Sequence, residues 1–236
     1  MIYIIYSASC PGLQFTMRAM IVEFLNVGLP RKEHFPDKEV VTGICKAPVT
    51  GPLRLGKTGF AGVDGVGDKK HHGGPDKAVC VYSLDHYPYW ENVLGSRLAP
   101  AAFGENLTVS NLHEDAVCIG DLFRLGAALV RISQPRQPCG TLAARYGRSE
   151  LVKLVVASGR TGFYFSVMEE GVVTRGDELV LEQRDPRGVS ISFANHIFHH
   201  DKNNCEGIDR VLAVPALSES WRRSFLELRE KCTAGP

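Results

Sequence analysis

The chain has 236 residues, 44% of them hydrophobic, which is enough apolar surface for one medium-sized domain with an appendage or for two small domains. Its 27 Lys and Arg residues balance 26 Asp and Glu residues. Because nonspecific nucleic-acid binding depends on a basic excess, this balance argues against a nucleic-acid partner. Any anionic ligand must then be held by a local pocket.

The N-terminal residues are apolar but do not match a secretion signal. No basic segment precedes the apolar run, and the run stops at Pro11, well short of the roughly 20 residues that a membrane span requires. A strand is predicted to begin after Met20, in MIVEFLNVGLP. We therefore expect residues 1–19 to be an N-terminal extension, and we expect no membrane partner.

Residues 20 to about 182 show a β-rich pattern, in which short runs of β-branched and aromatic residues are separated by Gly, Pro and Asp. The runs are IVEFLNV, VVTGICKAPV, AVCVYSL, NLTVSNL, DLFRLGAALVRIS and DELVLEQ. Many short strands with few helices indicate a closed or nearly closed β-barrel. Two helices are expected to interrupt it: SLDHYPYWENVLG, with Ser83 or Asp85 as N-cap, and GRSELVKLVVASG, which opens at Ser149 and ends at Gly159.

The pattern changes after Arg184, where DPRG is predicted to be a linker before three short helices. These are VSISFANHIFHH, EGIDRVLAV and LSESWRRSFLELREK, the last with Ser218 as candidate N-cap. Short helices cannot each bury an apolar face alone, so we expect a small bundle packed on itself or on the barrel. The predicted organisation is an extension (1–19), a barrel domain (20–185) and a three-helix domain (186–236).

The first candidate site segment is KHHGGPDKA, residues 70–78. Two glycines before a proline allow a sharp turn and a close approach to a ligand, and the surrounding Lys and His residues could form an anion-binding nest. An ordinary tight turn with solvated charges explains the same pattern. A second segment, FGENLT, offers Glu105 and Asn106 to the edge of a heterocycle, although an Asx-type turn entering a strand is an alternative.

The third candidate segment is QPRQPCGT, which follows a predicted central strand. The guanidinium of Arg136 favours the thiolate form of Cys139, and a thiolate can ligate a soft metal or carry sulfur. The alternative is a buried apolar cysteine. We expect that role for the other six, because their spacing matches neither a disulfide framework nor a zinc site and favours a reducing cytoplasm: Cys10, Cys45, Cys80, Cys118, Cys205 and Cys232.

A histidine cluster, His196, His199 and His200, is spaced for one helical face and could bind a metal. The apolar neighbours Phe193 and Ile197 favour ordinary amphipathic packing instead.

Taken together and in this order, KKHHGGPDKAV, FGENLTV and QPRQPC resemble the MOSC family, which is named after the C-terminal part of molybdenum cofactor sulfurase. The closer similarity is to bacterial proteins that confer resistance to 6-N-hydroxylaminopurine. It extends from about Met20 to the C-terminal helix and includes VGLPR and LSESWRR. The resemblance implies a mainly β fold, namely a MOSC-type β-barrel with a few helices followed by a small three-helix C-terminal appendage.

The resemblance also implies roles for individual residues. Cys139 is expected to be the catalytic residue that ligates molybdenum or carries sulfur. The residues expected to bind the cofactor are His72, Gly73, Gly74, Asp76, Lys77, Asn106 and Arg136. Relatives tend to carry Arg where this chain has Ser166, so Arg131 or Arg145 would have to compensate for its loss.

The function implied by the resemblance is that of an oxidoreductase with molybdenum cofactor (molybdopterin), which reduces small N-hydroxylated bases or related compounds. Electrons would come from a separate flavin or iron–sulfur protein, because the chain carries no motif for either group. The oligomeric state is left open, with a homodimer as one option. The alternative is a non-redox sulfur carrier or cofactor-binding module in which Cys139 holds a persulfide.

Overall fold

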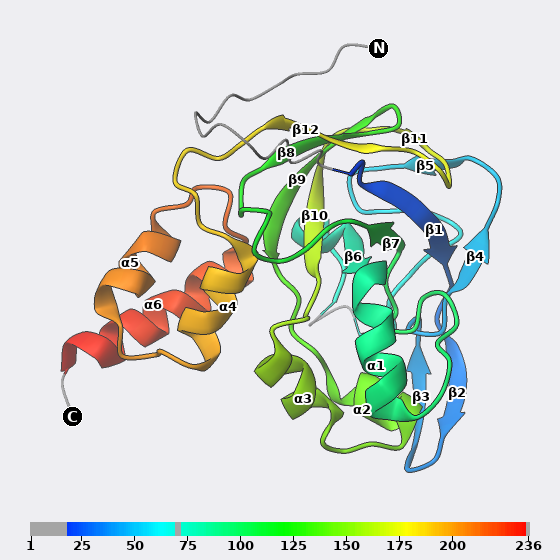
Figure 1. Ribbon diagram of the computed structural model, residues 1–236, viewed down its shortest axis with the longest axis horizontal. Helices are drawn as coiled ribbons and strands as arrows, with labels where there is room; N and C mark the ends of the chain where they lie inside the picture. The colour runs from blue at the N-terminus through cyan, green and yellow to red at the C-terminus, as the bar shows by residue number, and fades with distance from the viewer. Residues whose placement is uncertain (1–17, 69–71, 235–236) are drawn as a thin grey trace, which may run out of the picture.

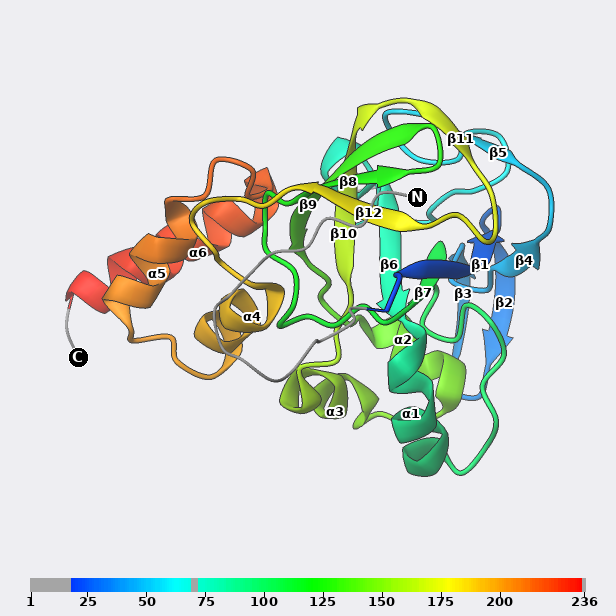
Figure 2. The same ribbon diagram turned by 45° about the horizontal axis from the view of Figure 1, so that its top comes forward.

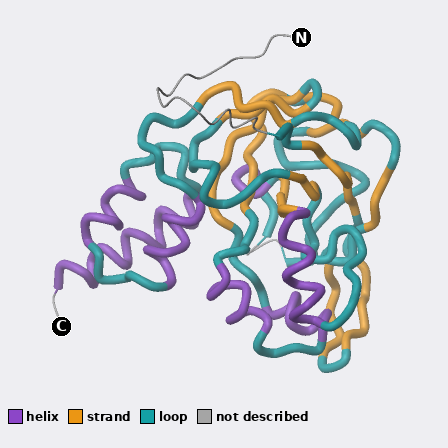
Figure 3. The backbone as a smooth tube through the Cα atoms, viewed as in Figure 1, coloured by secondary structure: helices purple, strands orange, loops and turns teal. Residues whose placement is uncertain are grey.

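A computed structural model describes residues 18–68 and 72–234 (Figure 1). The predicted N-terminal extension therefore lies almost entirely outside the described residues. A curled β-sheet forms the body of the protein, three short helices cover one end of it, and three further helices lie at its side (Figures 2 and 3). No helix among the described residues is long and apolar enough to cross a membrane.

The main sheet has eight strands in the order β12-β8-β9-β10-β6-β7-β1-β4. Every neighbouring pair is antiparallel except β6 and β7. The strands are β1 (Ile21–Val27), β4 (Ala47–Val49), β6 (Val79–Ser83), β7 (Leu107–Ser110), β8 (Leu122–Leu125), β9 (Ala128–Pro135), β10 (Phe163–Glu169) and β12 (Leu179–Gln183).

The sheet curls so that β1, the second strand from one end, reaches the segment before β12 at the other end. Ile21 at the start of β1 forms an antiparallel bridge with Glu178, next to β12. Two backbone hydrogen bonds support this bridge, from Val22 N to Asp177 O (3.0 Å) and from Leu179 N to Met20 O (2.8 Å). The mainly β, barrel-like fold predicted from the sequence is therefore confirmed.

Two small β-pairs stand outside the main sheet. β5 (Leu53–Leu55) pairs with β11 (Gly171–Val173), and β2 (Arg31–Phe35) forms a hairpin with β3 (Lys38–Thr42). The hairpin lies beside the helices at one end of the barrel (Figure 1).

Four helices of the barrel domain cover a second apolar cluster, which includes Trp90, Phe103 and Leu142. They are η2 (Leu84–His86), α1 (Tyr87–Leu94), α2 (Gly140–Tyr146) and α3 (Leu151–Ser158), whereas η1 (Pro75–Lys77) lies against β9 and β10. The Ser83 side chain caps η2 by accepting from Asp85 N, as the sequence suggested. The sequence analysis missed α2, because only seven residues separate Cys139 from the left-handed Gly147 that ends it.

The C-terminal helices are α4 (Ile191–His199), α5 (Cys205–Leu212) and α6 (Glu219–Ala234). This confirms the predicted three-helix appendage. Their buried residues Ile191, Trp221 and Phe225 belong to the same apolar cluster as the barrel residues Val130 and Phe165. The bundle is therefore packed on the barrel, and the two parts share one core.

The prediction that Cys205 and Cys232 are buried apolar cysteines outside any disulfide is wrong. Cys205 and Cys232 form a disulfide that links α5 to α6, with their Cα atoms 5.9 Å apart. The spacing of 27 residues carries no disulfide signature, and only the packing of the two helices brings the cysteines together. Cys80 and Cys118 are buried free thiols, as expected, and Cys45 is a partly buried one.

Candidate functional site

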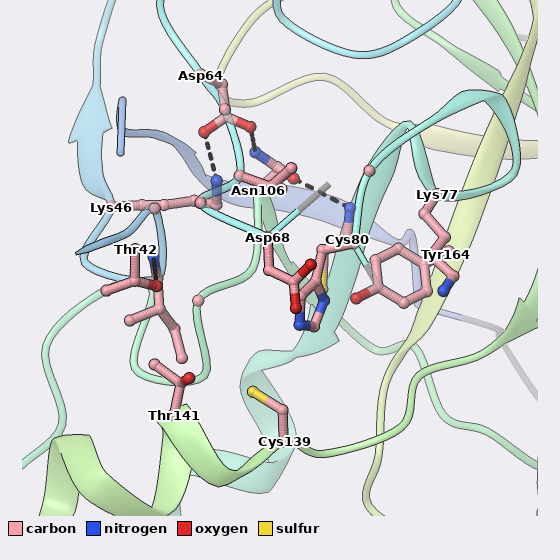
Figure 4. Close-up of a pocket in the computed structure, with 18 of the residues that line it drawn as sticks. Thr42, Lys46, Asp64, Asp68, Lys77, Cys80, Asn106, Cys139, Thr141 and Tyr164 are labelled. Carbon is pink, nitrogen blue, oxygen red and sulfur yellow. Dashed lines mark hydrogen bonds and ion pairs between the residues drawn. The ribbon is translucent and has the colours of Figure 1, made fainter. Parts of the chain in front are cut away.

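A cavity of about 680 Å³ lies in the barrel domain, a volume within the usual range for a small-molecule site. The three candidate segments, which are far apart in the sequence, converge on it (Figure 4). All predicted site residues except Asp76 line it, namely His72, Gly73, Gly74, Lys77, Asn106, Arg136 and Cys139. Segments 38–46 and 58–68 complete the wall.

The glycine-rich turn requires its glycines. Gly73 and Gly74 have φ angles of 74° and 84°, a region that side chains with a Cβ rarely adopt. A Cβ at Gly73 would also approach the Val66 side chain to 3.1 Å. The turn leads directly into η1, which places Lys77 at the cavity wall.

Cys139 immediately precedes α2 and faces the cavity (Figure 4). Burial alone would raise the pKa of its thiol. A hydrogen bond from His72, the charge of Arg136 and the amide of Leu142 outweigh burial and lower the pKa to about 6. Cys139 is therefore a thiolate at neutral pH.

Arg136 supplies a buried cation beside this thiolate. Its side chain is 5% exposed, and its Nη2 atom donates a hydrogen bond to the carbonyl of Phe103. Its Nη1 atom is buried and has no hydrogen-bond partner within the described part of the chain. An unsatisfied buried donor is costly, so this atom is suited to bind an anionic or carbonyl oxygen in the cavity.

A second thiol in the cavity has the opposite protonation state. Cys80 on β6 is buried, and burial raises its pKa to about 11. Tyr164 lines the cavity from β10, where it pairs with Cys80, and burial likewise raises the pKa of its hydroxyl. Both groups stay protonated at neutral pH, so Cys139 is the anionic sulfur of the cavity.

Asn106 lies at the cavity wall, but most of its hydrogen-bonding capacity is used by the protein. Its Nδ2 atom donates to Asp64 (2.8 Å) and to Asn26 O (3.2 Å), and its Oδ1 atom accepts from Cys80 N (3.1 Å). Asp64 also pairs with Lys46, and this network faces the cavity from the side away from Cys139 (Figure 4). The sequence analysis missed Lys46 and Asp64, since neither stands in a motif.

Two acidic residues of the candidate segments make hydrogen bonds within the protein and are not part of the described lining of the cavity. Glu105 is fully buried and accepts hydrogen bonds from the Tyr87 hydroxyl, Thr108 and Phe103 N. Asp76 does not belong to the described lining of the cavity, in contrast to the expectation from the resemblance. Its carboxylate instead accepts a hydrogen bond from the backbone amide at the start of α6.

The position expected to carry Arg does not face the cavity. Ser166 donates a hydrogen bond to Arg131 O (3.2 Å) on the neighbouring strand, and neither residue is part of the described lining. Arg145 is also outside the lining and donates to Ile44 O (3.1 Å) and Ala101 O (2.9 Å). Compensation by Arg131 or Arg145 is therefore not supported.

The histidine cluster lies in α4 and at its end, and it is not part of the described lining of the cavity. His199 packs against Phe198, with ring centroids 4.9 Å apart. Burial, with the charges of His200 and Lys202, lowers the pKa of His199 to about 4. The described residues include no group of three metal-binding side chains, so packing is the better interpretation.

Comparison with known proteins finds matches to both parts of the chain. The MOSC domain model matches residues 68–180, and a YiiM-like three-helix domain model matches residues 189–231. The Bacillus subtilis (strain 168) protein YflK is 50% identical over 207 residues, which cover 88% of this chain and 93% of YflK. The crystal structure of YiiM from Geobacillus stearothermophilus superposes with a TM-score of 0.77 at 40% identity, covering 89% of this chain and 99% of that one.

The chain belongs to the MOSC family. MOSC domains are a molybdenum-cofactor-binding family. The MOSC region is also similar to a protein of Gibberella moniliformis (strain M3125 / FGSC 7600) named "Reductase", at 35% identity over 150 residues. This match covers 62% of the chain but 26% of the fungal protein.

The residues of this MOSC cavity fit a bound molybdenum cofactor. A thiolate is a soft donor suited to molybdenum, and the unpartnered Nη1 atom of Arg136 is suited to a phosphate or pterin oxygen. Around Gly74 the backbone is open, since a Cβ there would meet no atom within 4 Å. A ligand could therefore approach the backbone of this turn closely.

Proposed function

We propose that this protein is a molybdenum-cofactor-dependent oxidoreductase that reduces N-hydroxylated bases or related small N-hydroxylated compounds to amines. The observation that carries the proposal is the Cys139 thiolate, which faces a cavity of about 680 Å³ beside the unpartnered Nη1 atom of Arg136. Membership of the MOSC family and the similarity to a fungal protein named a reductase support it.

In this proposal the chain holds the cofactor at two places. Cys139 ligates molybdenum, while Arg136, Lys77 and the backbone of the Gly73–Gly74 turn bind the pterin phosphate. The bound cofactor supplies two-electron redox chemistry, which side chains cannot perform.

The remaining groups of the cavity would bind the substrate. Reduction of an N-hydroxylated compound consumes two electrons and two protons and yields the amine and water. The protonated hydroxyl of Tyr164 can donate a hydrogen bond to the substrate oxygen, while Phe60 and Phe103 exclude water from the cavity. A separate flavin or iron–sulfur protein would supply the electrons.

A sulfur carrier is the second candidate function. The same low pKa makes the Cys139 thiolate a good nucleophile toward the outer sulfur of a donor persulfide. The donor would leave as its thiol, and Cys139 would then hold the persulfide with no metal bound. The two functions predict different contents of the purified protein, so that composition can distinguish them.

The test is elemental analysis of protein made in a host that synthesises the cofactor. The proposed oxidoreductase should contain about one molybdenum per chain, and Cys139→Ser should lose the metal and the ability to protect a hydroxylaminopurine-sensitive strain. Because serine has nearly the same shape, the variant should melt within a few degrees of the wild type. Cyanide-releasable sulfur on Cys139 without molybdenum would favour the sulfur carrier, and full protection by Cys139→Ser would exclude this cysteine from the reaction.

A further inference from the structure

Asp76 belongs to the glycine-rich segment but contacts the three-helix domain. Its Oδ2 atom accepts a hydrogen bond from Glu219 N at 3.1 Å. Its neighbour Lys77 lines the cavity, whereas Asp76 is outside the described lining. We infer that Asp76 is a positioning residue, through which α6 of the three-helix domain fixes the turn that binds the cofactor. This inference rests on the proposed function in so far as the bound group is the molybdenum cofactor.

The start of α6 is a favourable position for a carboxylate. The first amides of a helix have no partner within the helix, and a negative group near them is stabilised. The Ser218 hydroxyl accepts from Trp221 N (3.2 Å), and Ser218 O accepts from Arg222 N (2.9 Å), so Ser218 is the N-cap. Glu219 is then the first helical residue, and Asp76 satisfies its free amide.

The same helix start is also bound to the barrel. Ser218 N donates to Ser133 O at 3.1 Å, and the Ser220 hydroxyl donates to the Gln134 side chain at 3.1 Å. Ser133 and Gln134 lie on β9 and are buried. The contact with Asp76 therefore extends the junction between α6 and the sheet from the buried residues Ser133 and Gln134 to the protein surface.

This junction lies next to the cavity, because Asp76 is followed directly by Lys77, which lines the cavity. The Ser133 hydroxyl donates a hydrogen bond to the Asp76 carbonyl, and Lys77 N donates to Gly74 O at 3.1 Å. The η1 turn is thus held by β9 through its backbone and by α6 through the Asp76 side chain. A turn that is already ordered loses less conformational entropy when a ligand binds, which increases affinity.

Glu219 provides a test that leaves the cavity and Asp76 unchanged. Proline is favoured at the first position of a helix but has no amide hydrogen, so Glu219→Pro removes the donor and keeps the helix. Glu219→Ala is the matched control, because it removes the side chain and retains the amide. Asp76→Ala should behave like Glu219→Pro. Asp76→Asn should behave like the wild type, because its side-chain amide oxygen can still accept the hydrogen bond from Glu219 N.

Two measurements apply to these variants. Hydrogen exchange of residues 72–78 should be roughly two- to tenfold faster in Glu219→Pro and Asp76→Ala than in the wild type, the range expected for the loss of one hydrogen bond. Loss of bound molybdenum during dialysis should accelerate by a similar factor. Glu219→Ala and Asp76→Asn should match the wild type in both, and melting temperatures should stay within a few degrees.

The outcomes distinguish a failure of this inference from a failure of the proposed function. Unchanged exchange of residues 72–78 in Glu219→Pro would overturn the inference. Faster exchange in Asp76→Ala alone would also overturn it, since the carboxylate would then act on Lys77 by its charge. A wild type without molybdenum would refute the proposed function, whereas the exchange comparison would still decide whether α6 positions the turn.

Discussion

The two thiols of the cavity show how the surroundings of a residue set its chemistry. Cys80 lies within a β-strand and is buried, and its pKa is raised to about 11. Cys139 is partly buried, yet His72, Arg136 and the Leu142 amide lower its pKa to about 6. The same side chain is therefore a neutral packing group on β6 and an anionic thiolate at the start of α2.

This difference predicts a pH profile for alkylation of the cofactor-free protein. The rate of modification of Cys139 by iodoacetamide should rise with a midpoint near pH 6, since the thiolate is present above the pKa and is lost as the pH falls through it. Peptide mass spectrometry at several pH values measures this rate. His72→Ala should shift the midpoint upward, because the thiolate loses a donor. A wild-type midpoint at pH 8.5–9, the ordinary range for cysteine, would contradict the assignment.

At the scale of elements, the cavity wall depends on close backbone contacts. Gly43, just after β3, lies directly against the carbonyl of Gly65, and a Cβ at Gly43 would collide with that oxygen. Segments 42–46 and 64–67 are therefore packed tightly enough to hold Lys46 and Asp64 together.

Gly43→Ala should accordingly lower the free energy of unfolding by about 1–3 kcal/mol, because one segment must move away. Urea denaturation measures this change. Gly51→Ala is the matched control, since a Cβ at Gly51 would meet no atom within 4 Å and should change stability by less than about 0.5 kcal/mol. Equal changes in the free energy of unfolding for the two substitutions would show that the contact with Gly65 does not contribute to stability.

The disulfide between α5 and α6 allows a second prediction at this scale. Cys232→Ser should lower the free energy of unfolding by about 2–4 kcal/mol, because the unfolded chain loses a cross-link between residues 27 positions apart. Thermal melts with and without reductant test this. Reductant should lower the melting temperature of the wild type and leave that of Cys232→Ser unchanged. No effect of reductant on the wild type would contradict a stabilising bond.

At the scale of the whole molecule, the barrel and the three-helix domain share one apolar cluster. Two domains with separate cores can unfold independently, whereas a shared core favours one cooperative transition. Family models that match residues 68–180 and 189–231 separately therefore describe two segments of one packed body. The predicted domain boundary at residue 185 remains a prediction.

We expect calorimetry of the full chain to show a single unfolding transition with equal calorimetric and van't Hoff enthalpies. A shortened chain ending at residue 184 should be poorly soluble or melt at a much lower temperature, since removing Trp221 and Phe225 exposes their barrel partners. Two resolved transitions, or a shortened chain as stable as the full one, would show that the barrel is independent.

Local features of this protein could be predicted from its sequence. The strand pattern, the cap at Ser83, the N-cap at Ser218 and the left-handed Gly159 depend on residues within a few positions, where turn and cap energies act. The order of three motifs, compared with a known family, also identified Cys139, Arg136 and the glycine-rich turn as one site.

Only the tertiary structure decided how distant residues meet. It placed the Asp76 carboxylate against the start of α6 instead of in the cavity, joined Lys46 to Asp64, and brought Cys205 to Cys232. Each contact depends on strand order, register and helix packing, which local sequence patterns do not encode. The low pKa of Cys139 has the same origin, because it requires the hydrogen bond from His72, which belongs to a different segment, and the charge of Arg136 to outweigh the opposing effect of burial.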